Sequence, residues 1–163
     1  MILEERLARV ALLSMDLDGT LTDGGLYYTE EGAELRKYHV RDGMGIKMIQ
    51  ATGIRTAIIT MSMTPAITKR AERLAIEHLV LNARDKVAAL TTICDEIGIG
   101  LDQVAHIGDD VNDIPLLKVV GCPVAVADAM ESVRAVACWI TPNRGGAGAV
   151  RDLCDRLLAV RGH

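Results

Sequence analysis

Residues 10–20 read VALLSMDLDGT, and this stretch decides the fold of the 163-residue chain. Its apolar part, residues 10–16, is typical of a buried strand. The strand runs into Asp16 and Asp18, two carboxylates that share one face while the extended backbone persists. Gly19 and Thr20 then let the chain turn. The stretch therefore predicts a buried strand with two acids at its carboxyl end.

Short apolar runs continue to alternate with helical patterns along the chain. We expect further strands at residues 54–60, 79–81, 104–107 and 124–126, with a weak edge strand at 138–140. We expect helices at about residues 42–53, 65–75, 85–97, 112–120, 130–136 and 147–160. This alternation predicts an α/β fold, one domain over residues 1–163 with a central parallel sheet and helices on both faces. Ligands of such sheets bind beyond the carboxyl ends of the strands.

One segment, residues 20–40, breaks the alternation directly after the first strand. The run DGG at residues 23–25 and the run EEG at residues 30–32 are turn signals around a short tyrosine-containing stretch, which indicates a β-hairpin. A lone hairpin is only marginally stable in water, so we expect it to pack on something, such as another subunit.

Composition excludes several classes of protein. Aromatic residues make up 2% of the chain and its net charge is −4, which disfavours single-strand and duplex nucleic-acid binding. No apolar run reaches membrane-spanning length, and the acidic first residues do not resemble a signal peptide. The four cysteines have no CxxC spacing, so we expect reduced thiols in a cytoplasmic protein and no zinc site; they are at positions 94, 122, 138 and 154.

A second acidic stretch, GDDVND at residues 108–113, follows the expected strand at 104–107. Helix capping explains one acid there well and three poorly. Both acidic stretches follow parallel strands, so we expect them at the same edge of the sheet, where five carboxylates would repel one another. A divalent cation relieves such repulsion, and ligation by oxygen alone indicates Mg²⁺.

These parts suit phosphate chemistry. Asp16 can attack phosphorus and form an aspartyl-phosphate, while Asp18 can protonate the leaving oxygen and later activate water. Thr60 would offer a hydroxyl and an N–H at the end of the second strand, and Lys86 a positive charge at the start of a helix. Taken singly, Thr60 is equally a strand-end residue and Lys86 a solvated lysine. His106, inside a predicted strand, is expected to be a satisfied core histidine.

At this point the sequence resembles the haloacid dehalogenase superfamily of phosphohydrolases. DLDGT at residues 16–20 matches the first motif of the superfamily, Thr60 the second, Lys86 the third and GDDVND at residues 108–113 the fourth. The resemblance covers about residues 8–160. It implies a Rossmann-like three-layer sandwich without a cap domain, in which the hairpin is a small flap inserted after the first strand.

The resemblance also implies roles for the acids. Asp16 would be the nucleophile and Asp18 the general acid and base. Mg²⁺ would be bound by Asp16, by the backbone carbonyl of Asp18 and by Asp109. Asp110 and Asp113 would contact these ligands and orient them without binding the metal themselves.

Within the superfamily the chain is similar to phosphatases of 3-deoxy-D-manno-octulosonate 8-phosphate and of nonulosonate 9-phosphates. The likeness rests on LTDG at residues 21–24, RDGMG at 41–45, VAVADA at 124–129 and GGAGAVRD at 145–152. It implies a phosphorylated sugar acid as substrate. It also implies a homotetramer in which the hairpin and the C-terminal segment complete a neighbouring active site.

The chain departs from this family after Thr60. The family usually continues with Gly and then Arg or Glu, whereas residues 61–63 here read MSM. Ser62 is shorter and neutral, so we expect fewer contacts to a charged or hydroxylated substrate tail. Our candidates for contact with the substrate are Ser62, Arg73 and Gly146.

Two other functions stay open. A phosphomutase or a broad small-molecule phosphatase would use the same fold, although a mutase must exclude water from its aspartyl-phosphate and this chain has no cap. A weakened, regulatory or phospho-accepting relative is the other alternative, because fold does not fix function.

Overall fold

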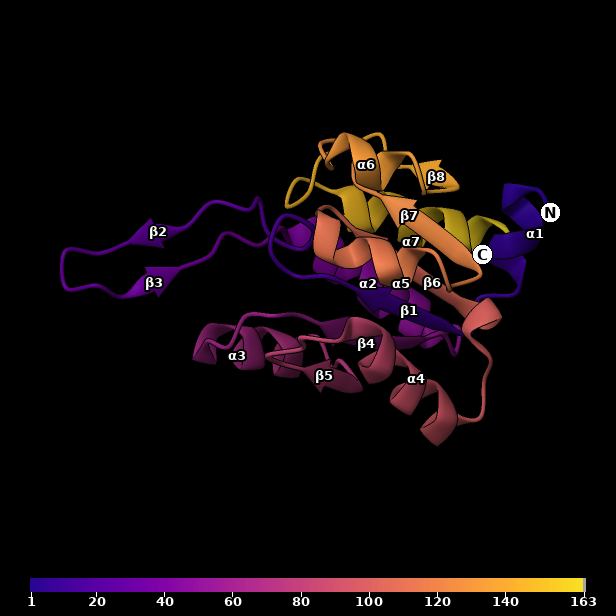
Figure 1. Ribbon diagram of the computed structural model, residues 1–163, viewed down its shortest axis with the longest axis horizontal. Helices are drawn as coiled ribbons and strands as arrows, with labels where there is room; N and C mark the ends of the chain where they lie inside the picture. Colours follow the sequence, from indigo (N-terminus) through magenta and orange to yellow (C-terminus); the bar gives the residue numbers. More distant parts are fainter. Residues whose placement is uncertain (163) are drawn as a thin grey trace.

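The computed structural model describes residues 1–162 and has a six-stranded parallel sheet at its centre (Figure 1). The strands lie in the order β5-β4-β1-β6-β7-β8, which places β1 between β4 and β6. Their bounds are β1 Leu12–Met15, β4 Arg55–Ile59, β5 His78–Val80, β6 Val104–Gly108, β7 Cys122–Ala125 and β8 Trp139–Ile140. The predicted α/β fold, including the edge strand β8, is confirmed.

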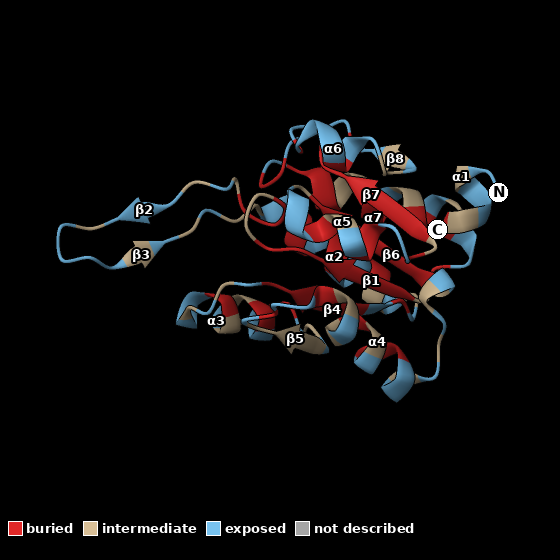
Figure 2. Ribbon diagram, viewed as in Figure 1, coloured by how far each residue is buried: buried red, intermediate tan, exposed pale blue. Residues whose placement is uncertain are grey.

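Helices cover both faces of the sheet. They are α1 Leu3–Ala8, α2 Val40–Ala51, α3 Pro65–Arg73, α4 Lys86–Ile97, α5 Ile114–Leu117, α6 Glu131–Arg134 and α7 Ala149–Ala159, with single turns η1 Leu101–Gln103 and η2 Val111–Asp113. Leu13 packs into the apolar cluster shared by α2 and α7, and its neighbour Leu12 into the cluster that contains α4. Successive strand residues point to opposite faces, so this split defines three layers. The strands in Figure 2 are accordingly buried while the helices keep an exposed outer side.

The hairpin predicted after β1 is present and stretches away from the sheet (Figure 1). Its strands β2, Tyr27–Tyr28, and β3, Glu34–Leu35, pair antiparallel, and a bridge between Thr22 and Tyr38 closes its base. The strands have two residues each, and most of the hairpin is exposed (Figure 2).

Two expected helices are shorter than predicted. The helix expected at 112–120 is instead η2 followed by α5, because the Asp113 carboxylate accepts the N–H groups of Asp109 and Asp110, and Pro115 stands in the first turn of α5. The helix expected at 130–136 is the single turn α6, because the chain is already back in the sheet where Cys138 donates to the Pro123 carbonyl. Within residues 1–162 no helix combines the length and apolar character of a membrane span.

Candidate active site

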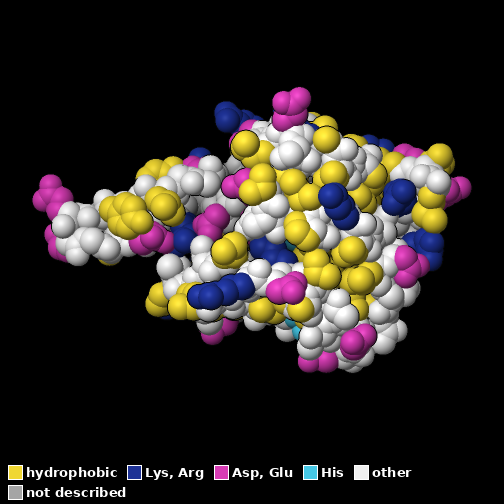
Figure 3. Space-filling model, viewed as in Figure 1, with side chains coloured by type: hydrophobic (Ala, Val, Ile, Leu, Met, Phe, Trp, Pro, Cys, Tyr) yellow, Lys and Arg dark blue, Asp and Glu magenta, His cyan; other side chains and the backbone are white. Residues whose placement is uncertain are grey.

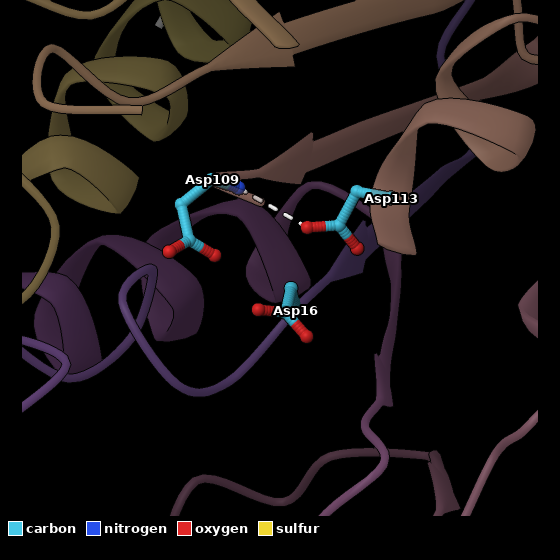
Figure 4. A group of neighbouring side chains, drawn as sticks. All are labelled: Asp16, Asp109 and Asp113. Carbon is cyan, nitrogen blue, oxygen red and sulfur yellow. Dashed lines mark hydrogen bonds between the residues drawn. The ribbon is translucent and has the colours of Figure 1, made fainter. Parts of the chain in front are cut away.

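The two acidic stretches meet at the carboxyl edge of the sheet, as predicted. Asp16 directly follows β1, Asp109 directly follows β6, and Asp113 ends η2. One carboxylate oxygen from each of the three lies within 4.8 Å of the others. Figure 4 shows the three side chains turned toward a common space. Asp113, expected only to support the ligands, therefore belongs to the group that could hold a metal ion.

A tight turn brings Asp16 and Asp109 together. The Leu17 carbonyl accepts the N–H groups of Thr20, Leu21 and Thr22, so the chain folds back immediately after the strand. Gly19 has a φ of +82°, and a Cβ there would overlap the Asp109 carboxylate. Only glycine allows both the conformation and the close approach, which explains why DLDGT carries a glycine after its second acid.

Lys86 is buried between two of these acids and is not a solvated lysine. Its Nζ donates to Asp16 Oδ1 and to Asp113 Oδ1, each at 2.6 Å. It is the first residue of α4, and the Asp85 carboxylate caps that helix by accepting the Ala88 N–H. Burial alone would lower the pKa of Lys86, but Asp16 and Asp113 raise it, so the ammonium stays charged.

His106 is fully buried in β6 and has partners at both ring nitrogens. Nδ1 lies 3.0 Å from Ser14 Oγ, and Nε2 lies 3.4 Å from Asp113 Oδ1. The prediction of a satisfied core histidine is confirmed, and the structure adds that this histidine touches a site carboxylate. Burial raises the pKa of Asp113, but contacts with His106 and Lys86 outweigh it and lower the pKa below its usual range.

The pKa values of the other two carboxyl groups, Asp16 and Asp109, are shifted upward. Burial and repulsion from Asp113 raise the pKa of Asp16 although Lys86 opposes them. Burial and the charge of Asp16 raise the pKa of Asp109 to about 8. One lysine is thus too little positive charge for three neighbouring acids, and a cation bound among them would let all three ionise at neutral pH.

The Asp18 carboxylate has partners of its own, outside the group of three acids. Its Oδ1 accepts Arg36 Nε at 2.7 Å, and its Oδ2 accepts the Ser62 hydroxyl at 2.5 Å. A general acid must present an oxygen to the leaving group, and these two contacts fix the orientation of the Asp18 carboxyl group. The Asp18 side chain is outside the group that could hold a metal, and its role in proton transfer stays a prediction.

Arg36 was missed by sequence reasoning. It follows β3 at the base of the hairpin, with only 5% of its side chain exposed. Besides Asp18 it contacts Glu34, Thr64 Oγ1 at 3.2 Å and Ser62 Oγ at 3.3 Å. The one available signal was that this hairpin leaves the sheet directly after the DLDGT motif, so a basic residue near its base can return to the site.

Three of the four catalytic candidates, Asp16, Asp18 and Thr60, line one small hollow of about 120 Å³, and Lys86 lies behind it in contact with Asp16. Thr60 is buried at the end of β4, and its Oγ1 accepts the Ser62 N–H at 3.1 Å. Asp110 is exposed and caps η2 through a bond from the Val111 N–H. The lining residues are Asp16, Asp18, Thr60, Met61, Ser62, Asp109, Asp110 and Asn112. A larger hollow of about 650 Å³ between α1 and α7 has no part of this chemistry.

Two substrate candidates are not brought to the hollow. Arg73 is exposed in the last turn of α3 and is not among the lining residues. Gly146 donates its N–H to the Thr20 carbonyl at 3.0 Å, and a Cβ on it would collide with the backbone of Thr22 and Asp23. The glycine-rich loop therefore packs on the turn after β1 of its own chain.

Comparison with known proteins agrees with this geometry. Residues 63–151 match the haloacid dehalogenase-like hydrolase family. The chain is 39% identical over 153 residues to the 3-deoxy-D-manno-octulosonate 8-phosphate phosphatase KdsC of Escherichia coli K12, covering 94% of this chain and 81% of that protein. The chain belongs to the KdsC family of haloacid dehalogenase-like hydrolases.

Solved KdsC structures share the fold closely. The Moraxella catarrhalis enzyme, in complex with magnesium ion, phosphate ion and KDO, is 35% identical with a TM-score of 0.95, over 97% of this chain and 91% of that one. The cobalt-bound Haemophilus influenzae enzyme is 34% identical with a TM-score of 0.92, over 96% and 92% of the two chains. The motifs that indicated a phosphatase therefore lie in a chain with the fold of known phosphatases. The predicted relationship to the capless haloacid dehalogenase-like phosphatases is confirmed.

Proposed function

We propose that this KdsC family member is a Mg²⁺-dependent phosphomonoesterase that hydrolyses a phosphorylated sugar acid and releases inorganic phosphate. The favoured substrates are 3-deoxy-D-manno-octulosonate 8-phosphate and a nonulosonate 9-phosphate. The observation that carries the proposal is the convergence of Asp16, Asp109 and Asp113 at the sheet edge. Lys86 bonds to Asp16 and Asp113, and Asp18 lines the same hollow as Asp16 and Asp109.

The residues present fit a divalent cation. Three carboxylates supply only oxygen ligands, the set that Mg²⁺ prefers, and burial together with the charge of Asp16 raises the pKa of Asp109 to about 8. When bound, the cation would neutralise charge on the phosphate oxygens. The Mg²⁺ in the Moraxella catarrhalis relative supports the same choice of metal.

The protein side chains then divide the reaction between them. Asp16 attacks phosphorus as the bond to the sugar oxygen breaks, and Asp18 gives that oxygen its proton. Water next attacks the phosphorus of the aspartyl-phosphate, Asp18 takes the proton, and Asp16 is released with inorganic phosphate. Lys86 holds Asp16 in place, and Thr60 lines the hollow where the phosphate oxygens would lie.

We also propose that the protein forms a homotetramer, and the small size of the hollow supports a site completed by another subunit. A hollow of about 120 Å³ suits a phosphate group, whereas ligand sites usually measure about 300–1,000 Å³. The sugar must therefore lie outside it, against a surface that another subunit could supply. The hairpin offers exposed apolar side chains for such an assembly, which are Leu26, Tyr27, Tyr28 and Leu35. Figure 3 shows hydrophobic side chains along this projection.

Phosphate release from a substrate panel tests the proposal. The panel contains eight- and nine-carbon sugar-acid phosphates, a neutral hexose phosphate and p-nitrophenyl phosphate, each with Mg²⁺, with a chelator, and after Mg²⁺ is restored. We expect kcat/KM for one sugar-acid phosphate to exceed that of the hexose phosphate by about 100-fold, with no turnover in chelator.

Other results of the panel would favour the alternatives. Similar kcat/KM values for all substrates would indicate a broad small-molecule phosphatase. A long-lived phosphoprotein without phosphate release would indicate a phospho-accepting protein. Turnover that survives the chelator would contradict the metal-dependent mechanism.

The cytoplasmic location stays a prediction.

A further inference from the structure

Two of the four cysteines lie in contact at the edge of the sheet. Cys122 is the first residue of β7, and Cys138 directly precedes β8. Their Sγ atoms lie 3.9 Å apart, and the Cys138 N–H donates to the Pro123 carbonyl at 2.8 Å. Cys122 is buried, whereas Cys138 is exposed. Cys138 can thus react with a reagent from solution, while Cys122 is buried and in contact with it.

The remaining two thiols provide an internal comparison. Cys94 is buried in the apolar cluster that contains α4, and Cys154 in the cluster formed by α2 and α7. They lie on opposite faces of the sheet and are closed to solvent. Ordinary core packing explains both of them but does not explain an exposed thiol against a buried one.

The backbone allows the two sulfurs to bond. Trp139 pairs with Val124, so Cys138 is level with Pro123 and Cys122 is its diagonal neighbour. A strand spacing of about 4.8 Å and a step of about 3.3 Å along the strand separate such Cα atoms by about 5.8 Å, within the range of about 4.4–6.8 Å that disulfides bridge. The sulfurs have to approach from 3.9 Å to about 2.05 Å. Rotation of the exposed Cys138 side chain supplies movement of this size without a change in strand pairing.

The surroundings make Cys138 the more reactive thiol. The hydrogen bond from Cys122 lowers the pKa of Cys138 to about 7, and Arg6 acts in the same direction. Arg6 is held at this end of the sheet by its bond to the Gly121 carbonyl at 2.5 Å. The same contact with Cys138, together with burial, raises the pKa of Cys122. The exposed sulfur is therefore the nucleophile and the buried sulfur the resolving thiol.

We propose that Cys138 and Cys122 form a thiol–disulfide exchange site for low-molecular-weight disulfides of the glutathione type. The Cys138 thiolate attacks the small disulfide, forms a mixed disulfide and expels one small thiolate, which takes up the proton lost by Cys138. Cys122 then attacks Cys138 Sγ, loses its own proton and expels the second small thiol. The protein gains one disulfide and loses two hydrogens, and the small disulfide is reduced to two thiols.

This site is separate from the proposed hydrolysis. Cys122 begins β7 and Cys138 precedes β8, whereas Asp16 and Asp109 follow the ends of their strands, so the thiols lie at the opposite edge of the parallel sheet. Failure of one proposal therefore leaves the other standing, and the experiment below does not use phosphatase activity as its readout.

The test uses the full-length reduced protein with glutathione disulfide at pH 7. After alkylation of free thiols, intact mass and peptide mapping should show loss of two hydrogens and a Cys122–Cys138 cross-link. Cys122→Ala should instead accumulate one glutathionyl group on Cys138, more slowly than the unchanged protein forms its cross-link, because the contact that lowers the pKa of Cys138 is lost. Cys138→Ser should lose both products, and Cys94→Ser should behave like the unchanged protein.

Three outcomes would overturn the proposal. They are an unmodified pair under conditions that oxidise a reference dithiol, a cross-link that includes Cys94 or Cys154, and absence of the glutathione adduct in folded Cys122→Ala. The adduct provides a readout that requires no disulfide geometry, so a poorly folding Cys138→Ser variant would not leave the question open.

Discussion

Single residues decide how charge is shared among the acids of the site. Lys86 lies 2.6 Å from an oxygen of Asp16 and of Asp113, and no hydrogen bond joins it to Asp109 among the described residues. Burial and the charge of Asp16 raise the pKa of Asp109 to about 8, and the pKa of Asp16 is raised as well in spite of its contact with Lys86. The nucleophile and the acid that neighbours it depend on a further positive charge for simultaneous ionisation.

Stability of the metal-free protein should consequently fall as the pH rises. A carboxyl group whose pKa is about 8 when folded and about 4 when unfolded binds more protons in the folded state, so its contribution is complete below pH 4 and lost toward pH 8. Urea titrations in chelator between pH 5.5 and 7.5 should show the free energy of unfolding decreasing, by at most ~1.4 kcal/mol per pH unit for this one proton.

Asp109→Asn should reduce this slope, and Mg²⁺ should suppress it in the unchanged protein. Asp95→Asn, at an exposed position of α4, is the matched control and should keep the slope. An equal slope in the Asp109 variant would show that a different group titrates.

Arg36 should matter most when the leaving group needs a proton. Because Arg36 and Ser62 position Asp18, Arg36→Gln should lower kcat about 100-fold for a sugar phosphate but less than about 10-fold for p-nitrophenyl phosphate, whose phenolate leaves without protonation. Arg36→Lys should recover part of the lost rate, and Lys37→Gln, at an exposed neighbour on the hairpin, should change neither rate.

Steady-state kinetics with both substrates checks this role of Arg36. Equal losses for the two leaving groups would assign Arg36 to phosphate binding or to folding instead. An effect on KM alone would contradict its role as a positioning residue for Asp18.

At the scale of elements, the long buried strands were predictable and the short connecting turns were not. The run at residues 10–16 has no polar residue before Ser14, and both faces of β1 are indeed buried. The helix expected at 112–120 failed because periodicity does not reveal that Asp113 bonds backward to the N–H of Asp109. That bond depends on the tertiary arrangement of the site.

The residues of the site also fall into a group that the sequence predicted and a group that it did not. Asp16, Asp18, Thr60, Lys86 and Asp109 all follow or open core elements, so their common edge could be predicted from the order of strands and helices. Arg36 lies in the hairpin, which interrupts the alternation of strands and helices. The sequence does not show how far a long side chain in a hairpin reaches or which residues it contacts. The contact of Ser62 with Asp18 was equally hidden, since Ser62 was considered only as a substrate contact.

At the scale of the whole molecule, the hairpin is the feature that the isolated chain leaves unexplained. Leu35 is 54% exposed on β3, next to other exposed apolar side chains, on a projection that lies away from the sheet (Figures 1 and 3). Exposed apolar surface of this kind is typical of an interaction site. Assembly through the hairpin would bury it and would also place additional surface near Arg36.

Light scattering during gel filtration tests the assembly. We expect a mass about four times that of the 17.5 kDa chain, and a smaller species for Leu35→Glu, because a buried charge in an interface is costly. Val119→Glu places the same charge at an exposed apolar residue outside the hairpin and should leave the mass unchanged. A monomeric unchanged protein at micromolar concentration would contradict the assembly.

Detection of phosphate on Asp16 tests the central claim most directly. Substrate and Mg²⁺ are mixed with the protein, quenched in acid within milliseconds and examined by peptide mass spectrometry, in parallel with Asp16→Asn. The account predicts one acid-stable phosphoryl group on the peptide that contains Asp16, and a folded Asp16→Asn variant that neither carries it nor releases phosphate. Turnover at the unchanged rate by Asp16→Asn, or phosphate on a different residue, would contradict the account.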